Sequence, residues 1–154
     1  MNVFENPALA KGIAIAASGV AAGLLLSMGV GVVRLVLKCR RQSAALPTTG
    51  ILLAIAMAAT PVTKLFYAFV VAMALSQRDL AESALSAAAT LSGGIFAMVA
   101  VLQGALAVRL MGALAASERA RTACNAKFAL LGAVESVAVF ALAGTIVFAA
   151  RLSA

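Results

Sequence analysis

Long stretches without charged residues are the feature that most limits how this chain can fold. Four such windows follow one another: residues 12–33 and 83–108 have no charge, 50–75 has only Lys64, and 128–150 has only Glu135. Each exceeds the roughly 20 residues that an α-helix needs to cross about 30 Å of hydrocarbon. Charged residues make up only 11% of the 154 residues, against about 25% in soluble domains. The sequence predicts an all-α integral membrane protein with four transmembrane helices.

The first window is interpreted as a retained helix and not as a cleaved signal peptide. A signal peptide has an apolar region of about 7–15 residues that follows positive charge. Here the apolar run spans residues 12–33, and Glu5 precedes it with only Lys11 for balance.

Basic residues gather in two of the three loops. The loop between the first two windows has Lys38, Arg40 and Arg41, and the loop between the last two has Arg109, Arg119, Arg121 and Lys127 against Glu118. Basic residues mark the cytoplasmic side of short loops. We therefore expect a multi-pass cell-membrane protein with these loops in the cytoplasm and both termini outside. The net charge of +7 then indicates contact with membrane lipids, and no nucleic acid is expected as a partner.

Two further patterns argue against chemistry on this chain alone. Cys39 and Cys124 occur without any histidine, so they form no zinc site and are expected to pack as small apolar residues. No GxxxxGK[ST] phosphate loop is present, so the chain is not expected to bind or hydrolyse ATP by itself.

The chain is interpreted as a single membrane domain, residues 1–154, made of two hairpins at about 8–77 and 82–154. The segment VVRL at 32–35 aligns with AVRL at 107–110, and PVTK at 61–64 aligns with VESV at 134–137. Both hairpins have the same span order and loop charge, so they are predicted to be tandem parallel repeats, as duplication of a two-helix unit produces.

Small residues form one face on the first helix of each hairpin. They are Gly12, Ala16, Gly19, Gly23, Ser27 and Gly31 in the first, and Ala89, Gly93, Ala97, Ala100 and Gly104 in the second. Such faces let helix backbones approach closely in a membrane. The other two helices have the bulky side chains, which suggests thin helices inside and bulky helices outside a curved ring.

Glu135 and Lys64 are the residues most costly to place in a membrane. An ionisable side chain at the centre of a span costs about 2.5–3.5 kcal/mol on insertion scales, and such residues are functional by default. Lys64 is too far from both ends of its span for its ammonium to reach water, so the sequence predicts an ion pair with Glu135. Pro61 frees a carbonyl about one turn back, near Met57, and Thr63, Tyr67, Ser136 and Gln103 are expected to add polar groups to the same layer.

These patches resemble the membrane proteolipid of V/A-type rotary ATPases, the rotor-ring subunit called K or c. Its double-hairpin members have four helices and one carboxylate, in the fourth helix. The segment GAVESVAVFALAGTIVF looks like that helix, and TPVTKLFYAFVVAMAL is similar to the second helix, which typically reads Leu-Pro-Gly-Thr-Gln-Gly-aliphatic-Tyr-Gly-Phe. Gln103-Gly104 matches a Gln-Gly pair in the third helix. The topology is similar over the whole chain, and the specific matches lie in these three patches.

The resemblance implies a non-catalytic subunit that assembles into a homo-oligomeric ring, without a cofactor. Glu135 would be the ion-binding carboxylate. Its surroundings would be Gln103, Thr63, Tyr67 and the Thr60 carbonyl. Expected partners are a stator subunit with an arginine and a central-stalk subunit at the cytoplasmic loops, with ATP hydrolysis on other subunits.

Lys64 departs from the family pattern, because the ion-coordinating members have glutamine there. An ammonium would occupy the place of a bound sodium ion, so the proton is the expected transported ion and sodium at Glu135 the less favoured one. Two other classes remain open. One is a small four-helix exporter, and the other is a non-conducting ring or structural subunit in which the Lys64–Glu135 pair only fixes the helices.

Overall fold

The computed structural model describes residues 3, 5–42, 48–114 and 118–152, with the backbone alone for 49, 118–128 and 152. Its elements in chain order are α1 (Pro7–Leu24), the π-helical η1 (Leu25–Val32), α2 (Val33–Gln42), α3 (Thr48–Ala59), the 3₁₀ turn η2 (Thr60–Val62), α4 (Thr63–Ser76), α5 (Glu82–Leu114) and α6 (Glu118–Leu152). Every regular element in these ranges is helical. The predicted all-α class is thereby confirmed.

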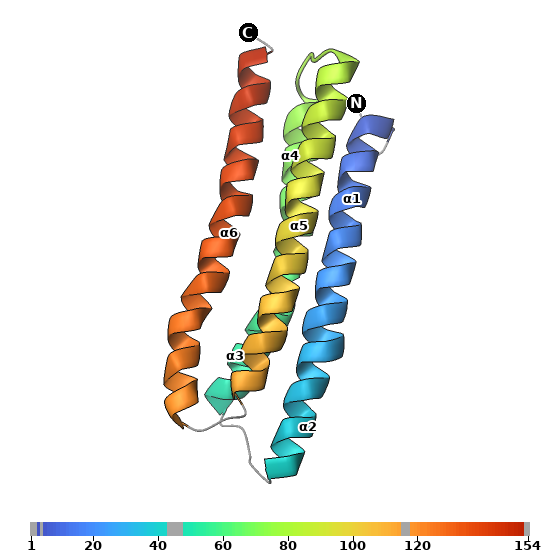
Figure 1. The fold of residues 1–154 in the computed structure, drawn as a ribbon. Helices are drawn as coiled ribbons and strands as arrows, with labels where there is room; N and C mark the ends of the chain where they lie inside the picture. The colour runs from blue at the N-terminus through green and yellow to red at the C-terminus, as the bar shows by residue number, and fades with distance from the viewer. Residues whose placement is uncertain (1–2, 4, 43–47, 115–117, 153–154) are drawn as a thin grey trace.

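Within the described residues, four helical stretches are long and apolar enough to cross a membrane, as the sequence predicted. They are Pro7–Gln42, Gly50–Ser76, Glu82–Leu114 and Ala129–Arg151. They lie side by side, with both ends of the chain at one end of the molecule and α2 at the other (Figure 1). The helix α5 packs against α1, α4 and α6. Only 11% of the most apolar window of the last stretch is buried, so α6 has the most open position of the four.

Glycines and alanines bring α1 and α5 into close contact. A Cβ atom on Gly12 would lie 2.6 Å from the Ala89 carbonyl oxygen, and one on Gly104 would lie 2.8 Å from the Gly23 Cα. These distances leave no room for a side chain, since real Cβ atoms do not approach other heavy atoms below 3.0 Å. The close approach that the small residues predicted is therefore present, and it lies between two helices of one chain.

Pro61 interrupts the second span, and neighbouring hydroxyls satisfy the carbonyls near the break. The Thr60 hydroxyl donates to the Met57 carbonyl at 2.6 Å, and the Ser27 hydroxyl of η1 donates to the Ala58 carbonyl at 3.0 Å. Both Ser27 and Pro61 are buried. A proline break in a membrane helix is tolerated where such groups replace the lost backbone hydrogen bonds, so the 3₁₀ turn can hold α4 in a fixed orientation.

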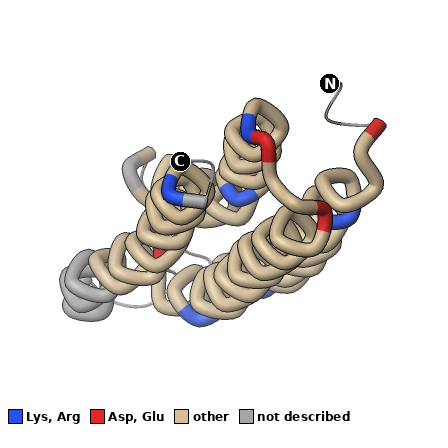
Figure 2. The backbone as a smooth tube through the Cα atoms, turned by 90° about the horizontal axis from the view of Figure 1, so that it is seen from above, with Lys and Arg blue, Asp and Glu red and all other residues tan. Residues whose placement is uncertain are grey.

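Most described charges lie near the helix ends, and Lys64 and Glu135 are the exceptions. In Figure 2 most of the backbone is tan, because few residues are charged. At the α2 end, the charged residues of α2 and α5 are all basic: Arg34, Lys38, Arg40, Arg41 and Arg109. The end with the termini has fewer described basic residues, Lys11, Arg78 and Arg151, and the positive-inside rule uses such a difference in the number of Lys and Arg residues.

Candidate functional site

The structure brings Lys64 and Glu135 into an ion pair in the apolar part of the bundle. Lys64 lies in the first turn of α4, directly after the proline turn η2, and its side chain is fully buried. Glu135 lies on α6, and its Oε2 contacts the Lys64 ammonium. The predicted pair is therefore present. It joins the two hairpins, because Lys64 belongs to the first and Glu135 to the second.

Hydrogen-bond donors surround the Glu135 carboxylate on both oxygens. The Tyr67 hydroxyl donates to Oε1 at 2.8 Å, and the Gln103 amide nitrogen donates to Oε2 at 2.7 Å. Lys64 also donates to Oε2, and the Thr63 hydroxyl lies 3.3 Å from Oε1. An ionised carboxylate offers about four acceptor positions. Tyr67, Gln103 and Lys64 provide donors for three of them, and the Thr63 hydroxyl can provide the fourth when it does not donate to the Thr60 carbonyl.

The Lys64 ammonium likewise has an acceptor for each of its three protons. Besides Glu135, it donates to the Thr63 hydroxyl oxygen at 2.7 Å and to the Thr60 carbonyl at 3.4 Å. The Thr63 hydroxyl can donate onward to the Thr60 carbonyl at 2.9 Å or to the carboxylate. The ammonium also lies 5.7 Å from the centre of the Tyr67 ring, within the range of a cation–π contact.

The site is closed towards α5 and more open on the side of α4 and α6. Lys64 and Gln103 are fully buried, whereas the Glu135 side chain keeps 25% of its surface exposed. Thr63 is exposed, and Phe66 and Phe140 on the same two helices are 66% and 77% exposed. The carboxylate can therefore be approached from outside the bundle.

All six residues predicted for the site belong to this one network: Glu135, Gln103, Thr63, Tyr67, Thr60 and Lys64. Ser136, which was expected in the same layer, is outside it. Its exposed hydroxyl donates to the Gly132 carbonyl at 3.1 Å, because the residue after Glu135 points to another side of the helix.

Sequence reasoning missed one supporting residue, Ser27, which it assigned only to the small-residue face. Its hydroxyl bonds a carbonyl just before Pro61. A polar residue within a face of glycines and alanines is the signal that could have identified it.

The network does not fit a bound sodium ion. Hard cations are held by shells of several oxygens, and here the Lys64 ammonium is bonded to the Thr63, Thr60 and Glu135 oxygens. The Gln103 Oε1 atom is buried and accepts no hydrogen bond from a described residue. One amide oxygen is too few for a cation shell. The described residues also contain no group of three or more His, Cys, Asp or Glu side chains placed to hold a metal.

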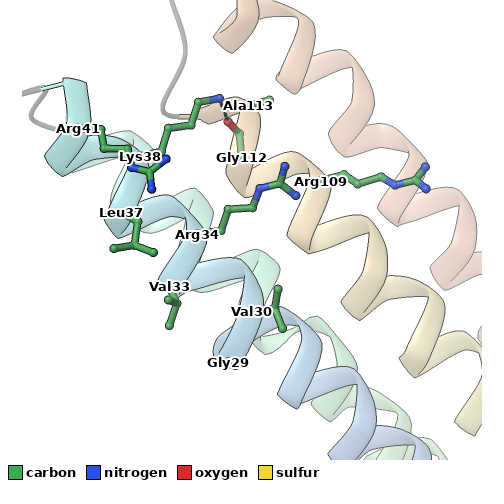
Figure 3. A pocket seen from close by; sticks show the side chains of 10 residues that line it. All are labelled: Gly29, Val30, Val33, Arg34, Leu37, Lys38, Arg41, Arg109, Gly112 and Ala113. Atoms are coloured by element: carbon green, nitrogen blue, oxygen red, sulfur yellow. Dashed lines mark hydrogen bonds between the residues drawn. The ribbon is translucent and has the colours of Figure 1, made fainter.

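A second feature is a groove between α2 and α5 at the basic end of the bundle (Figure 3). Its volume is about 970 Å³, its walls include Val30, Val33 and Leu37, and Arg34 and Arg109 are among its basic residues. Figure 3 shows the Lys38 side chain reaching across to α5, where its ammonium donates to the Gly112 carbonyl at 2.7 Å. Basic groups above an apolar wall suit a phospholipid with an anionic headgroup.

Comparison with known proteins gives this chain no family. No protein-family model matches it, and no curated protein sequence is significantly similar to it. Its function is therefore inferred from the residues and geometry described above.

Proposed function

We propose that the chain is a rotor-ring subunit of a V/A-type rotary ATPase, in which the Lys64–Glu135 site carries a proton across the membrane. The observation that supports this best is the buried ion pair with its surrounding polar contacts, open at Glu135 on one side of the bundle. Ionisable groups at such depth mark ion pathways more often than they serve packing alone.

A carrier in a rotating ring must be neutral while it faces lipid, since a bare charge in hydrocarbon is costly. In the proposal, the site is loaded from one half-channel of a stator subunit and turns through lipid in its neutral form. It is unloaded beside the stator arginine into the second half-channel. ATP hydrolysis takes place on other subunits.

Large apolar faces are exposed on the single chain and are compatible with assembly into a ring. On α6 these include Phe140 at 77%, Val147 at 56% and Phe148 at 55%, and Leu25 and Met28 on η1 are 71% and 55% exposed. In a ring, neighbouring copies and lipid would cover these faces. The helices α1 and α5, with their small residues, would then line the inner side and α4 and α6 the outer side.

The basic end of the bundle would face the cytoplasm, with both termini outside. Its loops would bind a central-stalk subunit, and the groove beside Arg34 and Lys38 would hold an anionic lipid.

The test is ATP-driven proton uptake by inverted membrane vesicles from cells that make the protein. Glu135→Gln should abolish uptake, because an amide cannot hold the charge that the cycle requires. Ser136→Ala is the matched control: it changes the next residue, whose hydroxyl bonds its own helix outside the site. Uptake that persists in Glu135→Gln vesicles would refute the proposal.

A non-conducting structural subunit is the second candidate, because the Lys64–Glu135 pair is neutral and already satisfied. It predicts that Glu135→Gln destabilises the protein without a change in proton uptake per assembled complex. A small exporter of cationic compounds is less favoured, since the Lys64 ammonium lies against the carboxylate that would bind them. It predicts dye efflux that requires Glu135.

A further inference from the structure

The side chains that contact the Glu135 carboxylate in the described part of the chain are all hydrogen-bond donors. Tyr67 and Thr63 approach Oε1, and Gln103 and Lys64 approach Oε2. At Oε2 the Lys64 ammonium and the Gln103 amide nitrogen can only donate, whereas the Tyr67 and Thr63 hydroxyls at Oε1 can donate or accept. The ammonium and the amide nitrogen at Oε2 match the ionised form of Glu135.

Among the four donors, Lys64 is the one suited to release a proton. The Gln103 amide and the Thr63 hydroxyl do not ionise under ordinary conditions, and loss of the Tyr67 proton would place a second negative charge beside the carboxylate. Loss of a proton from Lys64 leaves a neutral amine. The change in charge then falls on a fully buried side chain.

The charged and titratable groups that face Lys64 are few. Glu135 comes from α6 and Tyr67 from the same helix as Lys64, while α5 contributes the neutral Gln103. The first helix has no charged residue between Lys11 and Arg34. Apart from Tyr67, the charge of this layer is therefore set by Lys64 and Glu135 together.

We propose that Lys64 takes up and releases the transported proton, that Glu135 is its fixed counter-ion, and that the site is closed to sodium. In the loaded state the ammonium and the carboxylate have no net charge, as a lipid-facing carrier requires. On release, one N–H bond breaks and the proton passes to water in a half-channel. A neutral amine and a carboxylate remain, with a net charge of −1.

A cation on the stator favours this release. It repels the Lys64 ammonium and attracts the site once the net charge is −1. Protonation of the amine from the other half-channel restores the neutral pair. This inference rests on the proposed rotor function and names the cargo of that site, because the ammonium already uses the oxygens that a sodium ion would need.

Lys64→Arg and Lys64→Gln, compared by ATP-driven proton uptake in inverted vesicles, test the inference. A guanidinium keeps the cation but is not deprotonated in proteins, so Lys64→Arg should lower uptake per ring at least tenfold. Lys64→Gln also removes the proton carrier, so its uptake should fall as well. The uptake that remains on the Glu135 carboxyl should be sensitive to sodium, which can reach the vacated oxygens. Wild-type uptake should be unaffected by sodium.

Failure of the rotor function and failure of the proposed role of Lys64 give different results. Proton uptake that survives Glu135→Gln would overturn the rotor function itself. Uptake that requires Glu135 but is near the wild-type level in Lys64→Arg would overturn only the role of Lys64, and so would sodium inhibition of the wild type.

Infrared titration of wild-type rings decides the case even if Lys64→Arg does not assemble. The band of a protonated carboxyl is assigned to Glu135 by subtraction of the Glu135→Gln spectrum. The inference expects no such band at any pH at which the ring is intact. A Glu135 carboxyl band in that range would overturn it.

Discussion

Removing one member of the Lys64–Glu135 pair should lower the free energy of unfolding far more than removing both. The proposed variants are Lys64→Met, Glu135→Leu and the double variant, which fills the layer with apolar side chains of similar size. Loss of one partner from a buried ion pair typically costs about 3–5 kcal/mol, whereas replacement of the whole pair by apolar residues is often neutral or stabilising.

The structure predicts which of the two single variants is the less stable. Glu135→Leu leaves the Lys64 ammonium fully buried, with only the Thr63 hydroxyl and the Thr60 carbonyl as acceptors. It should therefore cost the full amount, about 3–5 kcal/mol. Lys64→Met leaves a carboxylate that is 25% exposed and retains its Tyr67 and Gln103 donors. Its cost should be smaller, about 2 kcal/mol, near the middle of the range for unsatisfied buried polar groups.

The assay is unfolding in mixed micelles with increasing denaturing detergent, followed by helical circular dichroism, for all four proteins. The free energy of unfolding of the double variant should lie within about 1 kcal/mol of the wild-type value or above it. The costs of the two single changes should therefore be coupled by several kcal/mol. Additive costs, or a Lys64→Met variant less stable than Glu135→Leu, would refute the reasoning.

Three further predictions concern the contacts around the site. Gly19→Leu should separate α1 from α5 and destabilise the protein by about 1–3 kcal/mol, measured by detergent-induced unfolding. The control Gly94→Leu on α5 should cost less, because no neighbouring atom lies within 4 Å of the added Cβ. Equal costs would contradict the close packing of these helices. Ser27→Ala should cost about 1–3 kcal/mol in the same assay, because it removes the hydrogen bond to the Ala58 carbonyl near the proline turn, and a neutral result would mean that another group replaces it. Arg34→Gln with Lys38→Gln should lower the number of anionic phospholipids retained in native mass spectra, and unchanged retention would exclude the groove as a lipid site.

The membrane class and the composition of the site could be predicted from the sequence, because both depend on costs that residue types reveal. Four windows with few or no charges become four membrane-length helices, since hydrocarbon admits few other backbone conformations. The Lys64–Glu135 pair follows from residue types alone, because a buried lysine needs a counter-ion and the spans offer one carboxylate. The position of Thr63, Tyr67 and Gln103 in the same layer was expected from the residues, and the resemblance added the Thr60 carbonyl; all four lie in the network.

The remaining details depend on three-dimensional geometry that the pattern does not contain. The rotation of α6 decides that Glu135 faces α4 while Ser136 does not, and no periodicity in the sequence indicated this. The π-helical segment Leu25–Val32 was not predicted, although it contains Ser27 and two glycines. The face of small residues could be predicted, but which helix it contacts depends on the packing of α1 against α5.

The mass of the assembled protein tests the central claim most directly. Native mass spectrometry of the protein extracted in mild detergent should give a single closed homo-oligomer of more than two copies, resistant to further detergent, with Glu135→Gln at the same copy number. A monomer or a dimer as the largest species would contradict a rotor ring and would favour the exporter.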